Sequence, residues 1–152
     1  MTKLVVDASA AASWLLASQA TKSALELLDR LGSYEPTAPQ VFQWEVGNLL
    51  VRQTRREPGF DLGEAFAILD SFNIALAPPA GKADIRTLAS VAATRGLSLF
   101  DAGYLWLAMK IDGAVASRDG GLLEAANAAG LHVFDLRGEP FIVQDLDYLA
   151  SE

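Results

Sequence analysis

The sequence predicts a three-layer α/β/α domain with a central, mostly parallel sheet of four or five strands. Two observations support this fold class. Short apolar segments alternate along the chain with longer segments in which apolar residues recur at helical spacing. Glycine, proline and capping residues separate the two kinds of segment. Such alternation is typical of a parallel sheet with helices on both faces, whose right-handed crossovers bring the carboxyl ends of the strands to one edge.

The predicted strands are short and apolar. In the first, over residues 3–6, Leu4, Val5 and Val6 are consecutive aliphatic residues, which indicates a strand buried on both faces. The other predicted extended segments are 37–38, 74–77, 114–117 and 131–134. We expect the segment 74–77 to be buried as well.

The predicted helices follow from apolar spacing and from capping residues. Ser18 is the predicted N-cap of the second helix, and Ile85, Leu88, Ala89 and Ala92 are expected to face the core from the fifth. The helical segments are about 10–16, 18–31, 39–55, 61–72, 82–95, 98–111 and 119–129.

Length and composition predict one domain over residues 1–152, with a flexible C-terminal tail from about residue 138. Half of the chain is hydrophobic, and it contains no cysteine. The lack of cysteine excludes disulfides, zinc–thiolate sites and thiol catalysis, and fits a cytoplasmic protein. We expect neither a signal peptide nor a membrane span, because no apolar run approaches the roughly 20 residues that a span requires.

The charge of the chain restricts how it can bind nucleic acid. The formal net charge is −7. A protein that binds nucleic acid by phosphate neutralisation alone should be basic. If this chain binds nucleic acid, a local basic patch or a bound cation must therefore attract the phosphates.

Four acidic residues lie where the predicted topology brings side chains to one edge of the sheet. Asp7 and Asp119 follow predicted strands, Asp101 begins a helix, and Glu45 lies in an early turn of a helix that starts from that edge. Each aspartate also has a structural explanation, as an N-cap or in a capping box with Ser98. Clustered carboxylates repel one another, and such oxygen-rich sites bind Mg²⁺ or Mn²⁺.

Glu45 is the least easily explained of the four acids as a structural residue. It lies inside a predicted helix among apolar residues, and Val41, Asn48 and Leu49 share its face. A carboxylate on a packed face is costly unless a partner such as a divalent cation satisfies it. The alternative is that Glu45 lies just beside the apolar face, with its carboxylate in water.

The residues around these acids resemble the PIN-domain ribonucleases, and among them the VapC-type toxins of bacterial toxin–antitoxin pairs. The matching segments occur in the order of the family and span nearly the whole chain. They are residues 5–9, 45–49, 97–104 and 116–119.

The resemblance implies a metal-dependent endoribonuclease in which Asp7, Glu45, Asp101 and Asp119 are catalytic and hold one or two Mg²⁺ or Mn²⁺ ions. A bound ion lowers the pKa of a water molecule that attacks the RNA phosphodiester, and cleavage in this family leaves a 3′-hydroxyl and a 5′-phosphate. Some relatives carry a further acid just after the position of Asp119, where this chain has two glycines. The number of bound ions, one or two, is therefore left open.

Three polar residues are expected to orient the carboxylates. The resemblance implies that Ser9 and Ser117 orient Asp7 and Asp119 or a metal-bound water, and that Asn48 fixes a carboxylate by hydrogen bonding. Ordinary backbone capping is an equally good explanation for the two serines.

Basic and aromatic residues supply further candidates for RNA contact. Arg52, Arg55 and Arg56 cluster at one helix end and Arg118 lies beside the site, although the three clustered arginines also suit a solvated helix C-terminus. For the tryptophans, the functional interpretation is base stacking. A place in the core or at an interface is the favoured interpretation, above all for Trp14. The other tryptophans are Trp44 and Trp106, and the single histidine, His132, is expected to be structural.

The resemblance also implies a cognate antitoxin as partner and a homodimer. One competing hypothesis is a PIN nuclease with a housekeeping role in RNA processing, and another is an inactive PIN fold, against which the four acids argue. A third, from another class, is a doubly wound, receiver-like signalling or binding module. That module would need paired acids near the N-terminus and a lysine on a late strand, whereas Lys110 falls on a predicted helix.

Overall fold

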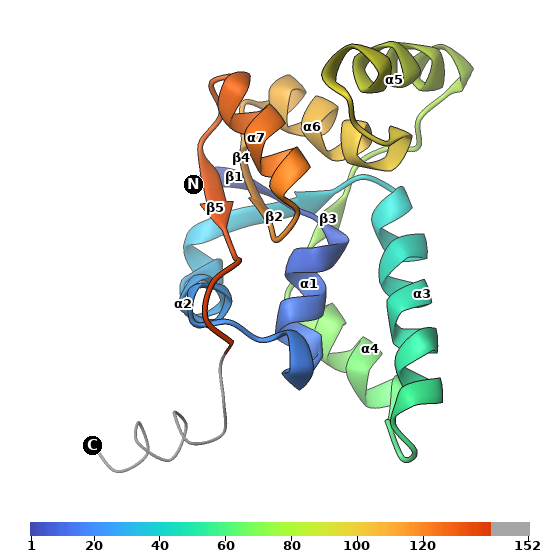
Figure 1. The fold of residues 1–152 in the computed structure, drawn as a ribbon, viewed down its shortest axis with the longest axis vertical. Helices are drawn as coiled ribbons and strands as arrows, with labels where there is room; N and C mark the ends of the chain where they lie inside the picture. The colour runs from blue at the N-terminus through green and yellow to red at the C-terminus, as the bar shows by residue number, and fades with distance from the viewer. Residues whose placement is uncertain (141–152) are drawn as a thin grey trace.

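The structure, a computed structural model that describes residues 1–140, contains a central sheet of five parallel strands (Figure 1). The strand order is β3-β2-β1-β4-β5. The strands are β1 (Thr2–Val6), β2 (Tyr34–Ala38), β3 (Ala75–Leu76), β4 (Ala114–Ser117) and β5 (Val133–Asp135). The predicted α/β/α fold class with a parallel sheet is confirmed.

Helices cover both faces of the sheet (Figure 1). The first face carries α1 (Ala8–Leu15), α2 (Lys22–Asp29), α3 (Val41–Arg56) and α4 (Leu62–Ser71). The second carries α5 (Lys82–Arg95), α6 (Leu99–Ile111) and α7 (Gly120–Ala128). The helices before and after the reversal of strand order at β1 therefore lie on opposite faces, as right-handed crossovers require.

The neighbouring strands β1 and β4 mark the point at which the strand order reverses. Their register pairs Val6 with Ala116, and the N–H of Asp7 donates to the carbonyl of Ala116 at 3.3 Å. This bond sets the residue after β1 beside the end of β4. In open α/β sheets, ligands bind in the crevice outside the strand ends at such a reversal.

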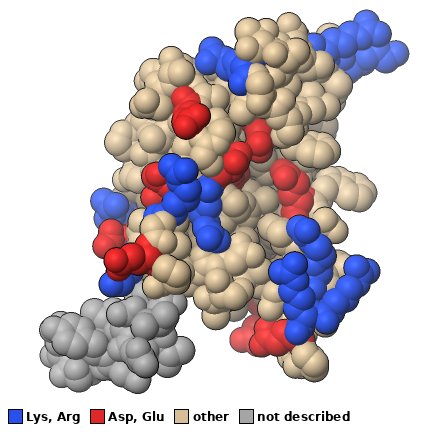
Figure 2. Space-filling model, in the orientation of Figure 1, with Lys and Arg blue, Asp and Glu red and all other residues tan. Residues whose placement is uncertain are grey.

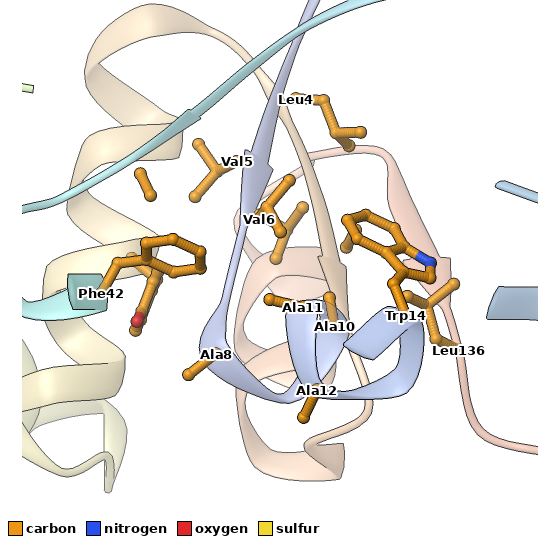
Figure 3. Close-up of a cluster of buried hydrophobic side chains, with 14 of the residues drawn as sticks. Leu4, Val5, Val6, Ala8, Ala10, Ala11, Ala12, Trp14, Phe42 and Leu136 are labelled. Atoms are coloured by element: carbon orange, nitrogen blue, oxygen red, sulfur yellow. The ribbon is translucent and has the colours of Figure 1, made fainter. Parts of the chain in front are cut away.

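Part of the core lies between β1 and α1, the helix that follows it (Figure 3), and another part lies under α6 and α7 on the other face of the sheet. Leu4, Val5 and Val6 are fully buried, and burial of each contributes roughly 1.5–3 kcal/mol. Ala10 and its small neighbours let α1 approach the sheet closely. Trp14 is 9% exposed, and its indole N–H donates to the Ala24 carbonyl at 2.8 Å, which confirms its predicted place in the core.

The second helix begins later than predicted. Ser18 is exposed and lies in a short 3₁₀ turn, Ala17–Gln19, and is not its N-cap. Thr21 is the N-cap of α2: its hydroxyl oxygen accepts the N–H of Ala24 at 3.1 Å. Both residues are good caps locally. The Thr21 hydroxyl alone also reaches a distant acceptor, the Leu136 carbonyl, at 2.7 Å.

Several apolar residues that were expected inside lie at the surface. The strand β3 is exposed at both of its residues, because it is the edge strand of the sheet. In α5, Ile85 and Ala89 are exposed, whereas Leu88 and Ala92 are buried. Helix α5 packs on α6 and not on the sheet itself, so only a narrow apolar face of α5 is buried. Trp44 is 82% exposed, so a place in the core is wrong for this residue.

The end of the chain leaves one prediction outside the structure. The flexible tail expected from about residue 138 falls almost wholly on residues 141–152, which lie outside the described part of the chain. In residues 1–140, none of the helices combines the length and the apolar character needed to cross a membrane.

Candidate active site

Asp7 lies at the reversal point of the sheet and is both a helix cap and a candidate site residue. Its Oδ1 accepts the N–H of Ala10 at 2.8 Å, which caps α1, and the hydroxyl of Ser9 at 2.7 Å. Its Oδ2 accepts the hydroxyl of Ser117, at the end of β4. The structural and the functional interpretation of Asp7 are therefore compatible.

Burial determines the protonation behaviour of Asp7. The residue is 4% exposed, and its burial raises the pKa to about 6. The hydrogen bonds from Ser117, Ala10 and Ser9 act in the opposite direction, and the negative charge of Glu45 raises the pKa further. Three hydrogen bonds thus do not compensate for the loss of water around this carboxylate.

The two serines join the turn after β1 to the turn after β4. Each hydroxyl donates to Asp7 and accepts a backbone N–H from the second turn. Ser9 Oγ accepts from Arg118 at 2.9 Å, and Ser117 Oγ accepts from Asp119 at 2.9 Å. Because a hydroxyl has one hydrogen, these contacts fix the orientation of both serines.

Asp101 and Asp119 form a second pair of carboxylates. Asp119 caps α7 by accepting the N–H of Leu122 at 3.3 Å, while Ser98 caps α6 by accepting the N–H of Asp101 at 3.1 Å. Burial, a hydrogen bond to Asp119 and the negative charge of Asp119 raise the pKa of Asp101 to about 6, and the charge of Asp7 adds to this effect.

Glu45 is held by a residue to which the sequence interpretation gave no role in the site. It lies in the second turn of α3, is half-buried, and its Oε1 accepts the hydroxyl of Tyr104 at 2.7 Å. Tyr104 is 1% exposed, and its pKa lies above the ordinary value because of burial, the charge and hydrogen bond of Glu45, and the charge of Asp7. The spacing of Asp101 and Tyr104, one turn apart on α6, was the available sequence signal.

The structure links the four acids electrostatically but does not close them around one point. Glu45 raises the pKa of Asp7, and Asp7 and Asp119 raise that of Asp101. In residues 1–140, however, no group of three or more acidic or histidine side chains is arranged to hold a metal ion. The site offers pairs of carboxylates. Pairs suit Mg²⁺, which keeps several waters and often binds through one or two carboxylates.

The remaining predicted residues lie around the acids. Asn48 is exposed, one turn from Glu45, and its side chain forms no hydrogen bond within the described residues. The hydrogen bond to the Glu45 carboxylate comes from Tyr104. Arg118 is half-buried and its Nη1 donates to the side chain of Gln19 at 3.1 Å. The α3 arginines are exposed, and Figure 2 shows basic side chains over the C-terminal half of that helix; they are Arg52, Arg55 and Arg56.

A comparison with known families gives this arrangement a context. The PIN domain family matches residues 4–128, which include all four acids and both serines. The chain belongs to the PIN domain family. PIN domains are generally nucleases and typically use divalent metal ions.

Solved structures share the PIN fold of this chain. PAE2754 from Pyrobaculum aerophilum is 21% identical, with a TM-score of 0.62 over 99% of this chain and 97% of its own. FitAcB from Neisseria gonorrhoeae is 18% identical, with a TM-score of 0.55, and the match covers 87% of this chain and 96% of its own. A domain of a functionally unknown protein from Methanocaldococcus jannaschii is 18% identical, with a TM-score of 0.51, and the match covers 94% of this chain and 96% of its own. No curated protein matches this PIN domain chain.

Proposed function

We propose that this PIN domain is a Mg²⁺- or Mn²⁺-dependent endoribonuclease. The observation that carries the proposal is that Asp7, Glu45, Asp101 and Asp119 lie around the reversal point of the sheet, near enough for the charge of one to raise the pKa of another. Two of these carboxylates have a pKa of about 6 because burial and neighbouring acids disfavour their charge. A site that accumulates uncompensated negative charge needs a cation, and oxygen donors select a hard one.

The four carboxylates, which the structure arranges in pairs, are the residues that would hold one or two ions. A divalent cation, when bound, neutralises their charge, lowers the pKa of a water and offsets the repulsion between the site and the RNA phosphates. The chain's own contribution is orientation. Ser9 and Ser117 fix the carboxylate of Asp7, and Tyr104 occupies Oε1 of Glu45. Within residues 1–140, Oε2 of Glu45 accepts no hydrogen bond and is free to bind the ion.

We further propose that the enzyme is the toxin of a toxin–antitoxin pair, acts in the cytoplasm and forms a homodimer. The motif resemblance supports the toxin role. A groove of about 1430 Å³ beside Glu45 supports a protein partner, because apolar side chains such as Phe100 and Trp106 line it.

Cleavage of RNA by the purified chain tests the enzymatic proposal. We expect fragments with 5′-phosphates in Mg²⁺ or Mn²⁺ and none in EDTA. Asp101→Asn should abolish this cleavage. Asp112→Asn, which changes the acid at the other end of the same helix, should leave it intact, since Asn also tolerates the left-handed conformation of Asp112. Equal cleavage by Asp101→Asn and the wild type would contradict the site assignment.

A further inference from the structure

The outer side of α3 carries exposed side chains that the proposed chemistry does not use. Trp44, directly before Glu45, is 82% exposed. Arg52, Arg55 and Arg56, in the last two turns of the helix, are exposed as well. One helix therefore joins a carboxylate of the candidate site to an aromatic and a basic surface.

The arginines are aligned with the site. Arg52 and Arg56 follow Glu45 by seven and eleven residues, and at 3.6 residues per turn these three positions lie within about 20° of one line along the helix. With a rise of about 1.5 Å per residue, Arg52 lies about 10 Å and Arg56 about 16 Å from Glu45 along the axis. Figure 2 shows the resulting group of basic side chains over the C-terminal half of α3.

These arginines are not neutralised by acids of the described chain. Within residues 1–140 the ion pairs join Lys22 to Glu139 and Arg137 to Asp135, and neither lies on α3. The acid next to them in sequence, Glu57, accepts a hydrogen bond from Gln53. In a chain with a net charge of −7, the end of α3 is thus a local positive surface beside an acidic site.

We propose that α3 is the RNA-binding element of this enzyme, and that it guides a single strand into the carboxylate site. Arg52 and Arg56 bind separate phosphates, because they lie about 6 Å apart along the axis and guanidinium groups suit phosphate geometry. Trp44 stacks on a base beside the cleavage point. A single strand is the partner because the bases of a duplex are not free to stack on a side chain.

This proposal rests on the proposed ribonuclease activity but makes its own prediction about binding. Phosphate contacts appear in the salt dependence of affinity, with a slope of about 0.7 per contact for single strands. Loss of Arg52 and Arg56 should therefore lower the slope of log Kd against log salt by about 1.4. Loss of the stacked base contact should weaken binding about tenfold without changing that slope.

The experiment measures binding of a fluorescent single-stranded RNA oligonucleotide to the full chain in EDTA, by anisotropy over a range of KCl concentrations. The first variant is Arg52→Gln with Arg56→Gln. Its control is Arg86→Gln with Arg95→Gln, which removes two exposed arginines from α5. Trp44→Ala is compared with Phe66→Ala, which removes a 40% exposed aromatic residue from α4.

The α3 variants should lose affinity as stated, and the α5 and α4 controls should bind like the wild type. Equal behaviour of the paired variants, or no RNA binding by the wild type, would overturn the proposal. The proposal would also be overturned if the α3 variants bound RNA like the wild type but eluted at a different volume in size-exclusion chromatography. In that case the surface of α3 would be an interface with another protein chain. Wild-type binding without Mn²⁺-dependent cleavage would instead refute the ribonuclease activity and leave α3 as a binding surface.

Discussion

Asp7 is a carboxylate that the fold buries although burial opposes its charge. It remains in place because it accepts three hydrogen bonds, from Ser9, Ala10 and Ser117. Its pKa of about 6, against 3.8 in the unfolded chain, shows that these bonds do not fully replace water. The residue therefore opposes folding near neutral pH unless a cation is bound, as is common for functional groups in strained or desolvated positions.

The sign of this effect gives a pH prediction. Between about pH 4 and pH 6 the folded state holds the Asp7 proton and the unfolded state does not, so the free energy of unfolding falls as the pH rises. From about pH 4 to pH 7 the loss due to Asp7 is roughly 2 kcal/mol. In Asp7→Asn, which cannot ionise, the fall should be smaller by that amount. Urea unfolding in EDTA at both pH values measures it, and an identical fall in both proteins would refute the raised pKa.

Tyr104 gives a second prediction for a single residue. Its hydroxyl fixes Glu45, so Tyr104→Phe should leave the protein folded but weaken Mn²⁺ binding by about tenfold, as for other groups that orient metal ligands. Titration calorimetry measures the affinity. Tyr34→Phe is the control, because Tyr34 packs on Phe134 by its ring and its hydroxyl forms no hydrogen bond within residues 1–140. Equal affinities in the two variants would show that the hydroxyl has no part in orienting Glu45.

At the scale of the element, the start of α2 allows a direct test of capping. Thr21→Ala removes the N-cap contact to Ala24 and the bond to the Leu136 carbonyl, and should lower the free energy of unfolding by about 1–2 kcal/mol. Ser18→Ala should change it by less than about 0.5 kcal/mol, because Ser18 is exposed. Denaturant unfolding of both variants decides between the caps. A larger effect at Ser18 would contradict the structure.

Local signals predict the elements well where they do not compete. Strand β1 and helices α3 and α6 agree with the sequence interpretation, because apolar runs and caps act within a few residues. The start of α2 differs because the contact that selects Thr21 comes from residue 136, beyond the reach of any local pattern. The exposure of Ile85 and Trp44 likewise depends on which faces the neighbouring elements leave uncovered.

At the scale of the whole molecule, topology allows the site to be expected from sequence. Acids after β1 and β4 meet because these strands are neighbours at the reversal of strand order. The sequence interpretation therefore places Asp7 and Asp119 at one edge, and their role as ligands remains a prediction. The Tyr104 contact depends on side-chain directions across the two helical layers, and the pairing of Asp101 with Asp119 depends on those at the starts of the neighbouring helices α6 and α7. Periodicity provides neither.

The central claim is that the four carboxylates, arranged in pairs, hold one or two divalent cations. Titration calorimetry of Mn²⁺ into the purified chain near neutral pH tests it most directly. We expect binding by the wild type and by Asp112→Asn, and much weaker binding by Asp7→Asn, Glu45→Gln, Asp101→Asn and Asp119→Asn. Absence of Mn²⁺ binding in the wild type, or an affinity unchanged in all four site variants, would contradict the account.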